Sequence, residues 1–374
     1  MLQTAESLPW YSFLGRARLP AAAPSACEAF AGKSILVTGA GGSIGTALTL
    51  RLAALMPRKL VLLEASENNL NWVEASLRAE TLDSVCASYL GSVTDENLLE
   101  KIYVHHRPTW VFHAAAHKHV ALLEDHPLSA LHNNAIGTLL VSRQSHISGA
   151  RVILVSTDKA AAPVSIMGAT KRLAESIVCA HGGTAVRLGN VLGSRGSAVE
   201  TFVRQCLGGQ PLTITHPEAR RYWITLEESV ELLLSAALES QATSGSGNRG
   251  PLLLAADLDR THCIQNLAEF IASQLSPHRS LSCTNTGLRP GEKMTEQLWA
   301  SDEKAARTGR NGLRIIETPL MSLPQLETGL KQLELAISNR DVASAIAILQ
   351  TLVDYTPSER IRAAVPASAL QAQT

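Results

Sequence analysis

Four side chains in the stretch VSTDKAAAPVSIMGATK have the types and the spacing to move protons. Thr157, Asp158 and Lys159 place a hydroxyl, a carboxyl and an amine in consecutive positions at the end of an apolar run, and Lys171 follows in MGATK. In water the carboxyl is ionised and the amine is protonated at neutral pH, which is the wrong state for an acid and a base. A closed site raises carboxyl pKa values and lowers amine pKa values, and we expect both shifts here. These four residues are the candidate catalytic residues.

A glycine motif near the amino end predicts a dinucleotide site. TGAGGSIG places Gly39, Gly42 and Gly45 three apart, directly after SILV and before the helix-like TALTLRLAALM. Glycines let the backbone approach a pyrophosphate, and a helix N-terminus offers it free N–H groups and a favourable dipole. Glu64 ends the next apolar run at the distance expected for a carboxylate that binds the adenosine ribose and repels a 2′-phosphate. The predicted cofactor is NAD, with NADP as the alternative.

These residues need a scaffold that brings the ends of separate strands together. SILVTG, KLVLLE, WVFHAAA and RVILVS have the pattern of buried strands, and amphipathic helical stretches lie between them. This alternation predicts an α/β fold with a doubly wound parallel sheet. We expect an N-terminal arm (1–32), a dinucleotide-binding domain (33–189), a mainly substrate-binding region interleaved with it (190–324), and C-terminal helices, about 326–355, followed by a disordered tail (325–374).

The composition excludes several classes of function. The 374 residues carry 33 basic and 33 acidic side chains without a basic run, which disfavours nucleic acid and anionic membranes as partners. Six scattered cysteines without a CxxC pair favour a reducing compartment. The start lacks a signal-peptide pattern, and no apolar run is long enough for a membrane span, so a cytoplasmic protein is expected. His113, His117 and His119 follow a strand rather than a helix, and we predict no metal.

Six motifs resemble those of the CapD-like polysaccharide-biosynthesis proteins, a branch of the extended short-chain dehydrogenase/reductases. They occur in the family's order: AAAHKHVALLEDHP, NNAIGT, STDKAAAPVSIMGATKR, RLGNVLGSRGS, THPEARRYWIT and TGLRPGEK. The resemblance extends from about Leu14 to Tyr355, which is nearly the whole chain. It implies a Rossmann-type fold with a smaller C-terminal substrate-binding region, assembled as a homodimer or a larger homo-oligomer. The sequence departs from the family at His117, where tyrosine is usual, and at Ser92, where aspartate is usual.

Members of this branch are nucleotide-sugar 4,6-dehydratases that act mostly on UDP-N-acetylglucosamine. They oxidise carbon 4, remove water across carbons 5 and 6, and return the hydride to carbon 6, which gives UDP-2-acetamido-2,6-dideoxy-4-hexulose. By this resemblance Asp158 would be the general acid, Lys159 the general base, and Lys171 the lysine that binds the nicotinamide ribose. We therefore expect a nucleotide-sugar substrate and a role in polysaccharide or modified-sugar biosynthesis.

The resemblance also implies the residues around the two ligands. The expected cofactor contacts are Gly39, Gly42, Ser43, Ile44, Gly45, Glu64, Ser92, Val93, Ala114, Ala115, Ala116 and Lys171. The expected substrate contacts are Lys118, His119, Met167, Asn190, Arg195, Arg221, Arg289 and Glu292. Guanidinium groups bind diphosphate oxygens bidentately, and a carboxylate can accept hydrogen bonds from ribose hydroxyls.

Met167 stands where most short-chain dehydrogenases have a tyrosine, four positions before the lysine. A thioether cannot move a proton, but the CapD-like branch commonly has methionine here, so the substitution does not indicate an inactive enzyme. Thr157 would hydrogen-bond oxygen 4 of the sugar, and a water molecule or Lys159 would accept the proton. We expect Thr157→Val to lose most activity and Met167→Tyr to be tolerated.

Three other functions remain open at this point. The first is a 4,6-dehydratase that also inverts carbon 5, although such relatives tend to have tyrosine at position 167. The second is a 4-epimerase, which normally uses the tyrosine that is missing here. The third is a non-catalytic NAD-sensing protein, which would typically have lost the catalytic groups that this chain retains.

Overall fold

The computed structural model describes residues 7–244, 251–278, 281–308, 310, 312–319 and 321–364. The predicted disordered tail falls largely on residues 365–374, which lie outside the described residues. Within the described ranges, no helix combines the length and the apolar character that crossing a membrane requires.

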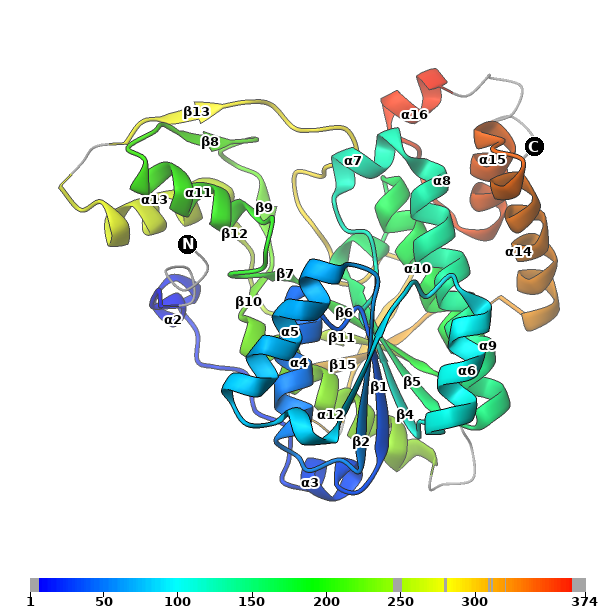
Figure 1. The fold of residues 1–374 in the computed structure, drawn as a ribbon. Coiled ribbons are helices and arrows are strands. Elements are labelled where there is room, and N and C mark those ends of the chain that lie inside the picture. Colours follow the sequence, from blue (N-terminus) through cyan, green and yellow to red (C-terminus); the bar gives the residue numbers. More distant parts are fainter. Residues whose placement is uncertain are drawn as a thin grey trace.

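A nine-stranded sheet forms the centre of the larger lobe (Figure 1). In spatial order its strands are β14 (Lys304–Arg307), β15 (Leu313–Glu317), β11 (Leu252–Ala256), β6 (Thr184–Leu188), β5 (Arg151–Thr157), β4 (Trp110–His113), β1 (Ser34–Thr38), β2 (Lys59–Glu64) and β3 (Cys86–Leu90). The strands from β11 to β3 run parallel to one another. At one edge of the sheet, β15 pairs antiparallel with β11, and β14 pairs antiparallel with β15. Runs such as SILVT are buried along their whole length, as a sheet covered on both faces requires. The predicted doubly wound sheet is confirmed.

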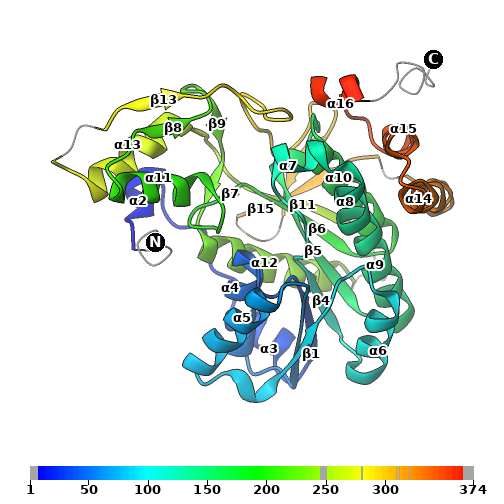
Figure 2. The same cartoon turned by 45° about the horizontal axis from the view of Figure 1, so that its top comes forward.

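Helices cover both faces of this sheet (Figures 1 and 2). One face carries α3 (Ser25–Phe30), α4 (Ser43–Ala53), α5 (Glu67–Ala79) and α12 (Leu226–Ser244), and the other carries α6 (Glu96–His106), α9 (Gly137–Ser148) and α10 (Ile166–Ala180). A short 3₁₀ turn, Asp83–Val85, precedes β3. Side-chain caps begin several of the helices: Ser66 accepts a hydrogen bond from the Asn69 N–H, and Asp95 accepts one from the Leu98 N–H.

A smaller lobe lies beyond the carboxyl ends of the parallel strands (Figure 2). It contains α11 (Ala198–Leu207), α13 (Ile264–Leu275) and three strand pairs: β8 (Leu212–Ile214) with β13 (Cys283–Asn285), β7 (Asn190–Val191) with β10 (Trp223–Ile224), and β9 (Arg220–Arg221) with β12 (His262–Cys263). The lobe has its own apolar core, which includes Phe202, Trp223 and Leu267. Because α12 and β11 return to the large sheet, the chain crosses between the lobes more than once.

The N-terminal segment packs against both lobes. In α2 (Trp10–Leu14), the Trp10 ring lies 5.9 Å from the ring of Phe270 in the smaller lobe. Further along, Phe30 of α3 is fully buried in the core of the large lobe. Arg16 lies between these helices and forms an ion pair of 2.6 Å with the buried Glu228 at the start of α12. From residue 7 on, the segment predicted as an arm therefore packs against the rest of the protein.

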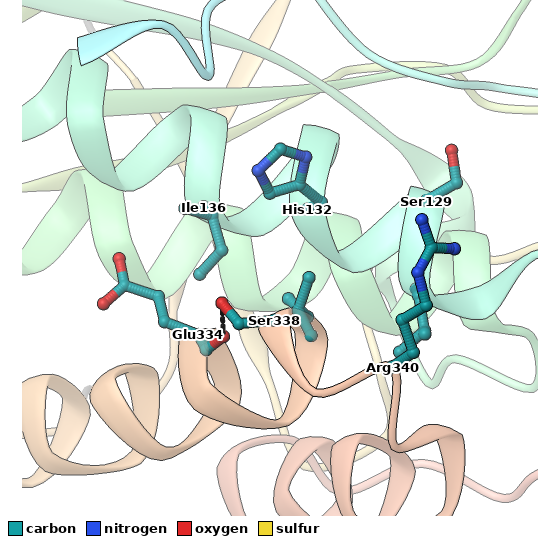
Figure 3. A pocket seen from close by; sticks show the side chains of 8 residues that line it. Ser129, His132, Ile136, Glu334, Ser338 and Arg340 are labelled. Atoms are coloured by element: carbon teal, nitrogen blue, oxygen red, sulfur yellow. Dashed lines mark hydrogen bonds between the residues drawn. The ribbon is translucent and has the colours of Figure 1, made fainter.

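The C-terminal part forms α14 (Leu323–Ser338), α15 (Val342–Leu352) and α16 (Glu359–Ala364). The predicted helical stretch is thus two helices, and Asp341 caps the second by accepting a hydrogen bond from the Ser344 N–H. Helix α14 packs against a π-helical turn, Leu131–Ile136, that continues α8 (Pro127–Ala130). A cavity of about 640 Å³ lies at this contact. His132 and Ile136 line one side of it, and Glu334 and Arg340 line the other (Figure 3).

Candidate active site

A cavity of about 1150 Å³ lies between the two lobes, at the carboxyl ends of the parallel strands. Ligands of open α/β sheets bind in this place, where the strand order reverses; here the reversal lies between the neighbouring strands β1 and β4. Its walls contain many of the predicted site residues: Gly42, Ser43, Ile44, Gly45, Ala114, Ala116, Lys118, His119, Thr157, Lys159, Met167, Lys171, Asn190, Arg195, Arg221, Arg289 and Glu292. The predicted residues Gly39, Glu64, Ser92, Val93, Ala115 and Asp158 are not in its walls.

Thr157, Asp158 and Lys159 form a hydrogen-bonded group where β5 ends. Asp158 is fully buried, and its Oδ1 accepts hydrogen bonds from Thr157 Oγ1 and from Lys159 Nζ, both at 2.9 Å. The other carboxyl oxygen, Oδ2, has no partner among the described residues. Lys159 Nζ also donates to Asn190 Oδ1 at 2.9 Å. The structure therefore joins a buried carboxyl to a hydroxyl and an amine that both line the cavity.

The surroundings of the triplet raise the pKa values of both Asp158 and Lys159. Burial raises the pKa of Asp158, in the direction predicted for a general acid. Burial lowers the pKa of Lys159, but the negative charges of Asp158 and Glu296 outweigh burial, and the net shift is upward. The predicted downward shift of the lysine pKa is therefore wrong, because the charge of Asp158, together with that of Glu296, outweighs burial.

Glu296 is a site residue that the sequence analysis missed. It is buried, lines the cavity, and lies 3.6 Å from Lys159 Nζ and from Lys293 Nζ. Its pKa is lowered because three cations, Lys159, Lys293 and Arg221, outweigh the effect of burial. Glu296 lies four positions after Glu292, just beyond RPGEK. Nothing in the sequence indicates that its carboxylate reaches Lys159 at the end of β5.

Helix α10 positions Lys171 and Met167. Ser165 caps its first turn, and the buried Glu124 of α7 (Val120–Asp125) accepts a hydrogen bond of 2.7 Å from the Ile166 N–H. Lys171 Nζ donates to the carbonyl oxygen of Val155 at 2.7 Å, and burial lowers its pKa to about 8. Met167 is 5% exposed and lines the cavity.

The glycine loop has the shape that a pyrophosphate requires. Gly39 has a positive φ of 66°, and a Cβ on it would lie 2.6 Å from the backbone nitrogen of Ala115. A Cβ on Gly45 would lie 2.0 Å from the carbonyl oxygen of Gly39. Only glycine lets the loop pass this close to its neighbours, which leaves the N-terminus of α4 open toward the cavity. The loop therefore fits a dinucleotide.

The Glu64 carboxylate is hydrogen-bonded to the backbone of this loop. Its Oε2 accepts a hydrogen bond from the Gly41 N–H at 2.9 Å, and its Oε1 accepts one from the Ser66 N–H at 3.0 Å. Ribose binding by Glu64 stays a prediction. Ser92 Oγ accepts a hydrogen bond from the Thr94 N–H at 3.1 Å, and Val93 packs on Gly137. Cofactor binding by these two residues stays a prediction.

An asparagine on the π-helical turn holds the loop after β4. Asn134 is buried, and it accepts a hydrogen bond from the His117 N–H and donates one to the His117 carbonyl oxygen. It also donates to Thr170 Oγ1, which ties this loop to α10. The role of Asn134 was not predicted, although the motif NNAIGT contains it. π-Helical turns often occur at functional sites, and this one positions the segment that carries Lys118 and His119.

The histidines of this segment have separate surroundings. His113 is buried between Thr38 Oγ1, at 2.6 Å, and Thr138 Oγ1, at 2.9 Å, and burial lowers its pKa to about 3. It is therefore neutral, and it packs at the carboxyl end of β4. His119 lies against Gly196. Within the ranges that the structure describes, no three metal-ligating side chains come together.

The predicted substrate residues lie on several walls of the cavity. Arg221 is buried and donates to the backbone oxygens of Arg220 and Met294. Arg289 and Glu292 occupy one tight turn, in which Glu292 Oε2 accepts a hydrogen bond from the Arg289 N–H. Arg195 extends toward the glycine loop, where it donates to the carbonyl oxygen of Gly41. These roles in substrate binding stay predictions.

The comparisons with known proteins agree with this geometry. Residues 35–318 match the family described as "Polysaccharide biosynthesis protein". The chain is 37% identical to the "Probable polysaccharide biosynthesis protein EpsC" of Bacillus subtilis (strain 168) over 73% of this chain, and 35% identical to the "Capsular polysaccharide biosynthesis protein CapD" of Staphylococcus aureus over 72%; each alignment covers 46% of the relative. It is 33% identical to a "UDP-N-acetylglucosamine 4,6-dehydratase (inverting)" of Campylobacter jejuni, over 73% of this chain and 79% of that protein.

Solved structures of the same fold include two that align over most of this chain. Pen from Bacillus thuringiensis matches with a TM-score of 0.67 at 23% identity, over 81% of this chain and 99% of that chain. A double mutant of the dTDP-glucose 4,6-dehydratase DesIV from Streptomyces venezuelae, with NAD and DAU bound, matches with a TM-score of 0.61 at 18% identity, over 71% and 87%.

The parallel sheet and the glycine loop define a Rossmann-type fold, which the chain shares with these solved structures. By its sequence the chain belongs to the polysaccharide biosynthesis family, and EpsC and CapD are among its relatives. It spans about half the length of these two curated relatives.

Proposed function

We propose that this protein is an NAD-dependent nucleotide-sugar 4,6-dehydratase that converts UDP-N-acetylglucosamine to UDP-2-acetamido-2,6-dideoxy-4-hexulose. The observation that carries the proposal is the contact of the buried Asp158 with both Thr157 and Lys159 at the cavity wall. The Campylobacter jejuni relative bears the name of a UDP-N-acetylglucosamine 4,6-dehydratase, which supports the substrate and the class of reaction. The family description supports a place in polysaccharide biosynthesis.

The glycine loop and Lys171 would hold the NAD. The first turn of α4 presents free N–H groups to a pyrophosphate, and Lys171 would bind the nicotinamide ribose. The NAD-bound structural neighbour supports this cofactor. When bound, NAD supplies the reversible hydride acceptor that oxidation at carbon 4 and reduction at carbon 6 require. The protons are the task of the protein's own residues.

Thr157 and Asp158 form a route for the proton of the sugar's 4-hydroxyl. The Thr157 hydroxyl lines the cavity and donates to Asp158 Oδ1, so it can accept a proton from oxygen 4 while it passes its own to the carboxylate. Asp158 then carries the proton that the hydroxyl leaving carbon 6 needs, and burial raises the pKa of Asp158, which helps the carboxyl to hold this proton once it has arrived. The proton from oxygen 4 therefore leaves in the water molecule, and no tyrosine is required.

Lys159 serves as the base at carbon 5. In its neutral form the amine takes the carbon 5 proton, and it returns a proton to carbon 5 once the hydride has reached carbon 6. Asn190 and Asp158 fix the amine at the cavity wall through two hydrogen bonds of 2.9 Å. The neutral, active fraction of Lys159 grows with increasing pH, and because Asp158 and Glu296 raise the pKa of Lys159, this growth is displaced to higher pH.

A second candidate is the same reaction with inversion at carbon 5. The Campylobacter jejuni relative is named as the inverting enzyme, which favours this candidate. In that case the proton returns to the opposite face of carbon 5. Either the sugar intermediate has to rotate in the site, or Lys159 Nζ has to reach the other face of the ring. Met167, where inverting relatives tend to have tyrosine, favours retention.

Incubation with UDP-N-acetylglucosamine in deuterium oxide tests both candidates. We expect a new methyl signal from a 4-keto-6-deoxy sugar in the proton spectrum, with deuterium at carbon 5, and the ring couplings report whether carbon 5 has inverted. Asp158→Asn and Lys159→Met are the matched inactive variants. The absence of product from a preparation that contains bound NAD would contradict the proposed substrate, and a panel of other UDP-, dTDP- and GDP-sugars would then separate another substrate from a sensing protein.

A further inference from the structure

A loop of the smaller lobe contacts the glycine loop of the predicted dinucleotide site. This loop, residues 193–197, follows β7 and precedes α11. At its tip the Arg195 guanidinium donates to the carbonyl oxygen of Gly41 and to Asn69 Oδ1, both at 3.0 Å. The Arg195 N–H donates to Ser43 Oγ at 3.0 Å. Three hydrogen bonds thus join one residue of the smaller lobe to the glycine loop and to the start of α5.

The same residue is held from the opposite side of the cavity. Lys118, on the loop after β4, donates from Nζ to the Arg195 carbonyl oxygen at 2.6 Å. His119 packs on Gly196, where a Cβ would lie 2.9 Å from its Cε1. The Trp72 indole lies 5.7 Å from Arg195 Cζ, at a distance that allows a cation–π interaction. Arg195 therefore connects the loops after β1 and after β4, which border the strand-order reversal where a dinucleotide binds.

We propose that Arg195 is a clasp that retains the dinucleotide during the catalytic cycle. Gly41 and Asn69 use two of the five guanidinium N–H donors, so three donors and the positive charge remain for an anion that binds at the glycine loop. A dinucleotide leaves only when these contacts between the lobes open.

The need for such a clasp rests on the proposed function. A dehydratase without net redox change has to return the hydride from the same cofactor molecule that removed it. If the reduced cofactor left between the two hydride transfers, the sugar would remain oxidised at carbon 4 and still lack the hydride at carbon 6. Slow cofactor release is therefore a requirement of this chemistry, and Arg195 is a retention residue rather than a catalytic residue.

Cofactor exchange in the absence of sugar measures the clasp directly. The purified protein is loaded with radiolabelled NAD, chased with excess unlabelled NAD, and the bound label is followed over time. We expect Arg195→Met to release NAD at least about tenfold faster than the wild-type protein, since it loses two hydrogen bonds and a charge. Arg204→Met removes an exposed arginine from the end of α11, and we expect it to release NAD at the wild-type rate.

Asn69→Ala breaks the same contact from the other lobe and should accelerate release in the same direction, which keeps the test valid if Arg195→Met does not fold. Release rates of folded Arg195→Met and Asn69→Ala within about twofold of wild type would overturn the clasp. Because no sugar is present, this result is independent of the substrate. Failure of the wild-type protein to convert any nucleotide sugar, with release still accelerated in Arg195→Met, would overturn the proposed function and leave the clasp intact.

Discussion

The substitution Thr157→Val tests the proton route most directly. Valine has nearly the shape of threonine, so the change removes the hydroxyl and keeps the packing at the end of β5. The hydroxyl donates to Asp158 Oδ1 at 2.9 Å and accepts a longer hydrogen bond of 3.4 Å from the Lys159 N–H. Without it, the proposed route from oxygen 4 through a hydroxyl to the buried carboxyl is lost, and Lys159, which also contacts Asp158 Oδ1, is needed as the base at carbon 5.

The expected magnitude follows from these contacts. Positioned proton transfer typically contributes about 100- to 10,000-fold in rate. We therefore expect kcat to fall by this factor, which corresponds to roughly 2.7–5.4 kcal/mol of activation free energy. The free energy of unfolding should change by only about 1–2 kcal/mol, because Asp158 Oδ1 keeps its hydrogen bond from Lys159 Nζ.

The assay is the rate of methyl-signal formation from UDP-N-acetylglucosamine at saturating substrate, with urea unfolding and the bound NAD content as checks on the fold. Thr157→Ser is the matched control, since it keeps a hydroxyl at the same position, and it should retain activity within about tenfold of wild type. A Thr157→Val protein with kcat within about threefold of wild type would refute the proton route, and another group would have to accept the proton of oxygen 4.

Three further predictions concern the surroundings of the triplet and the core. Glu296→Gln removes a negative charge beside Lys159 and therefore lowers the pKa of Lys159, so the acidic limb of the kcat/KM profile should move to lower pH; an unmoved limb would show that the two groups are not coupled. Met167→Tyr should keep activity within about tenfold of wild type, and a larger loss in steady-state kcat would contradict the view that this position needs no proton-transfer group. Arg187→Met removes the fully buried one of the two arginines that pair with the buried Glu175 and Glu303, leaving Arg172, and should cost roughly 3–5 kcal/mol in urea unfolding. Burial raises the pKa of Glu303, but hydrogen bonds and charge from Arg187 outweigh it and hold the pKa at about 2, below the usual 4.5. Its contribution to stability is therefore complete above pH 4.5 and lost as the pH falls toward 2, and the variant should lose less stability over this range.

Much of the large lobe could be predicted because its signals are local. The apolar runs that became β1, β2, β4 and β5 are continuous in the sequence, and the glycine motif follows the first of them directly. The break in the C-terminal helical stretch, near Asn339, was not predicted, although Asp341 has the type of a helix cap. The packing of the N-terminal segment on both lobes was also not predicted, since nothing local indicates that Arg16 pairs with Glu228, which lies far along the chain.

In the candidate site, too, some features could be predicted from the sequence and others depend on the tertiary structure. The amino-acid sequence by itself determined which chemistry is available: a glycine loop for a dinucleotide, and a hydroxyl, a carboxyl and an amine in one triplet. The tertiary structure decided the state of these groups, because a pKa depends on charges and burial that come from distant segments. Lys159 shows this most clearly, since Glu296 approaches it from a different part of the chain and adds to the charge of Asp158, and together they reverse the pKa shift that burial alone would produce. Arg195 shows it for binding, because its partners Gly41 and Asn69 belong to the opposite lobe and no spacing in the sequence relates them.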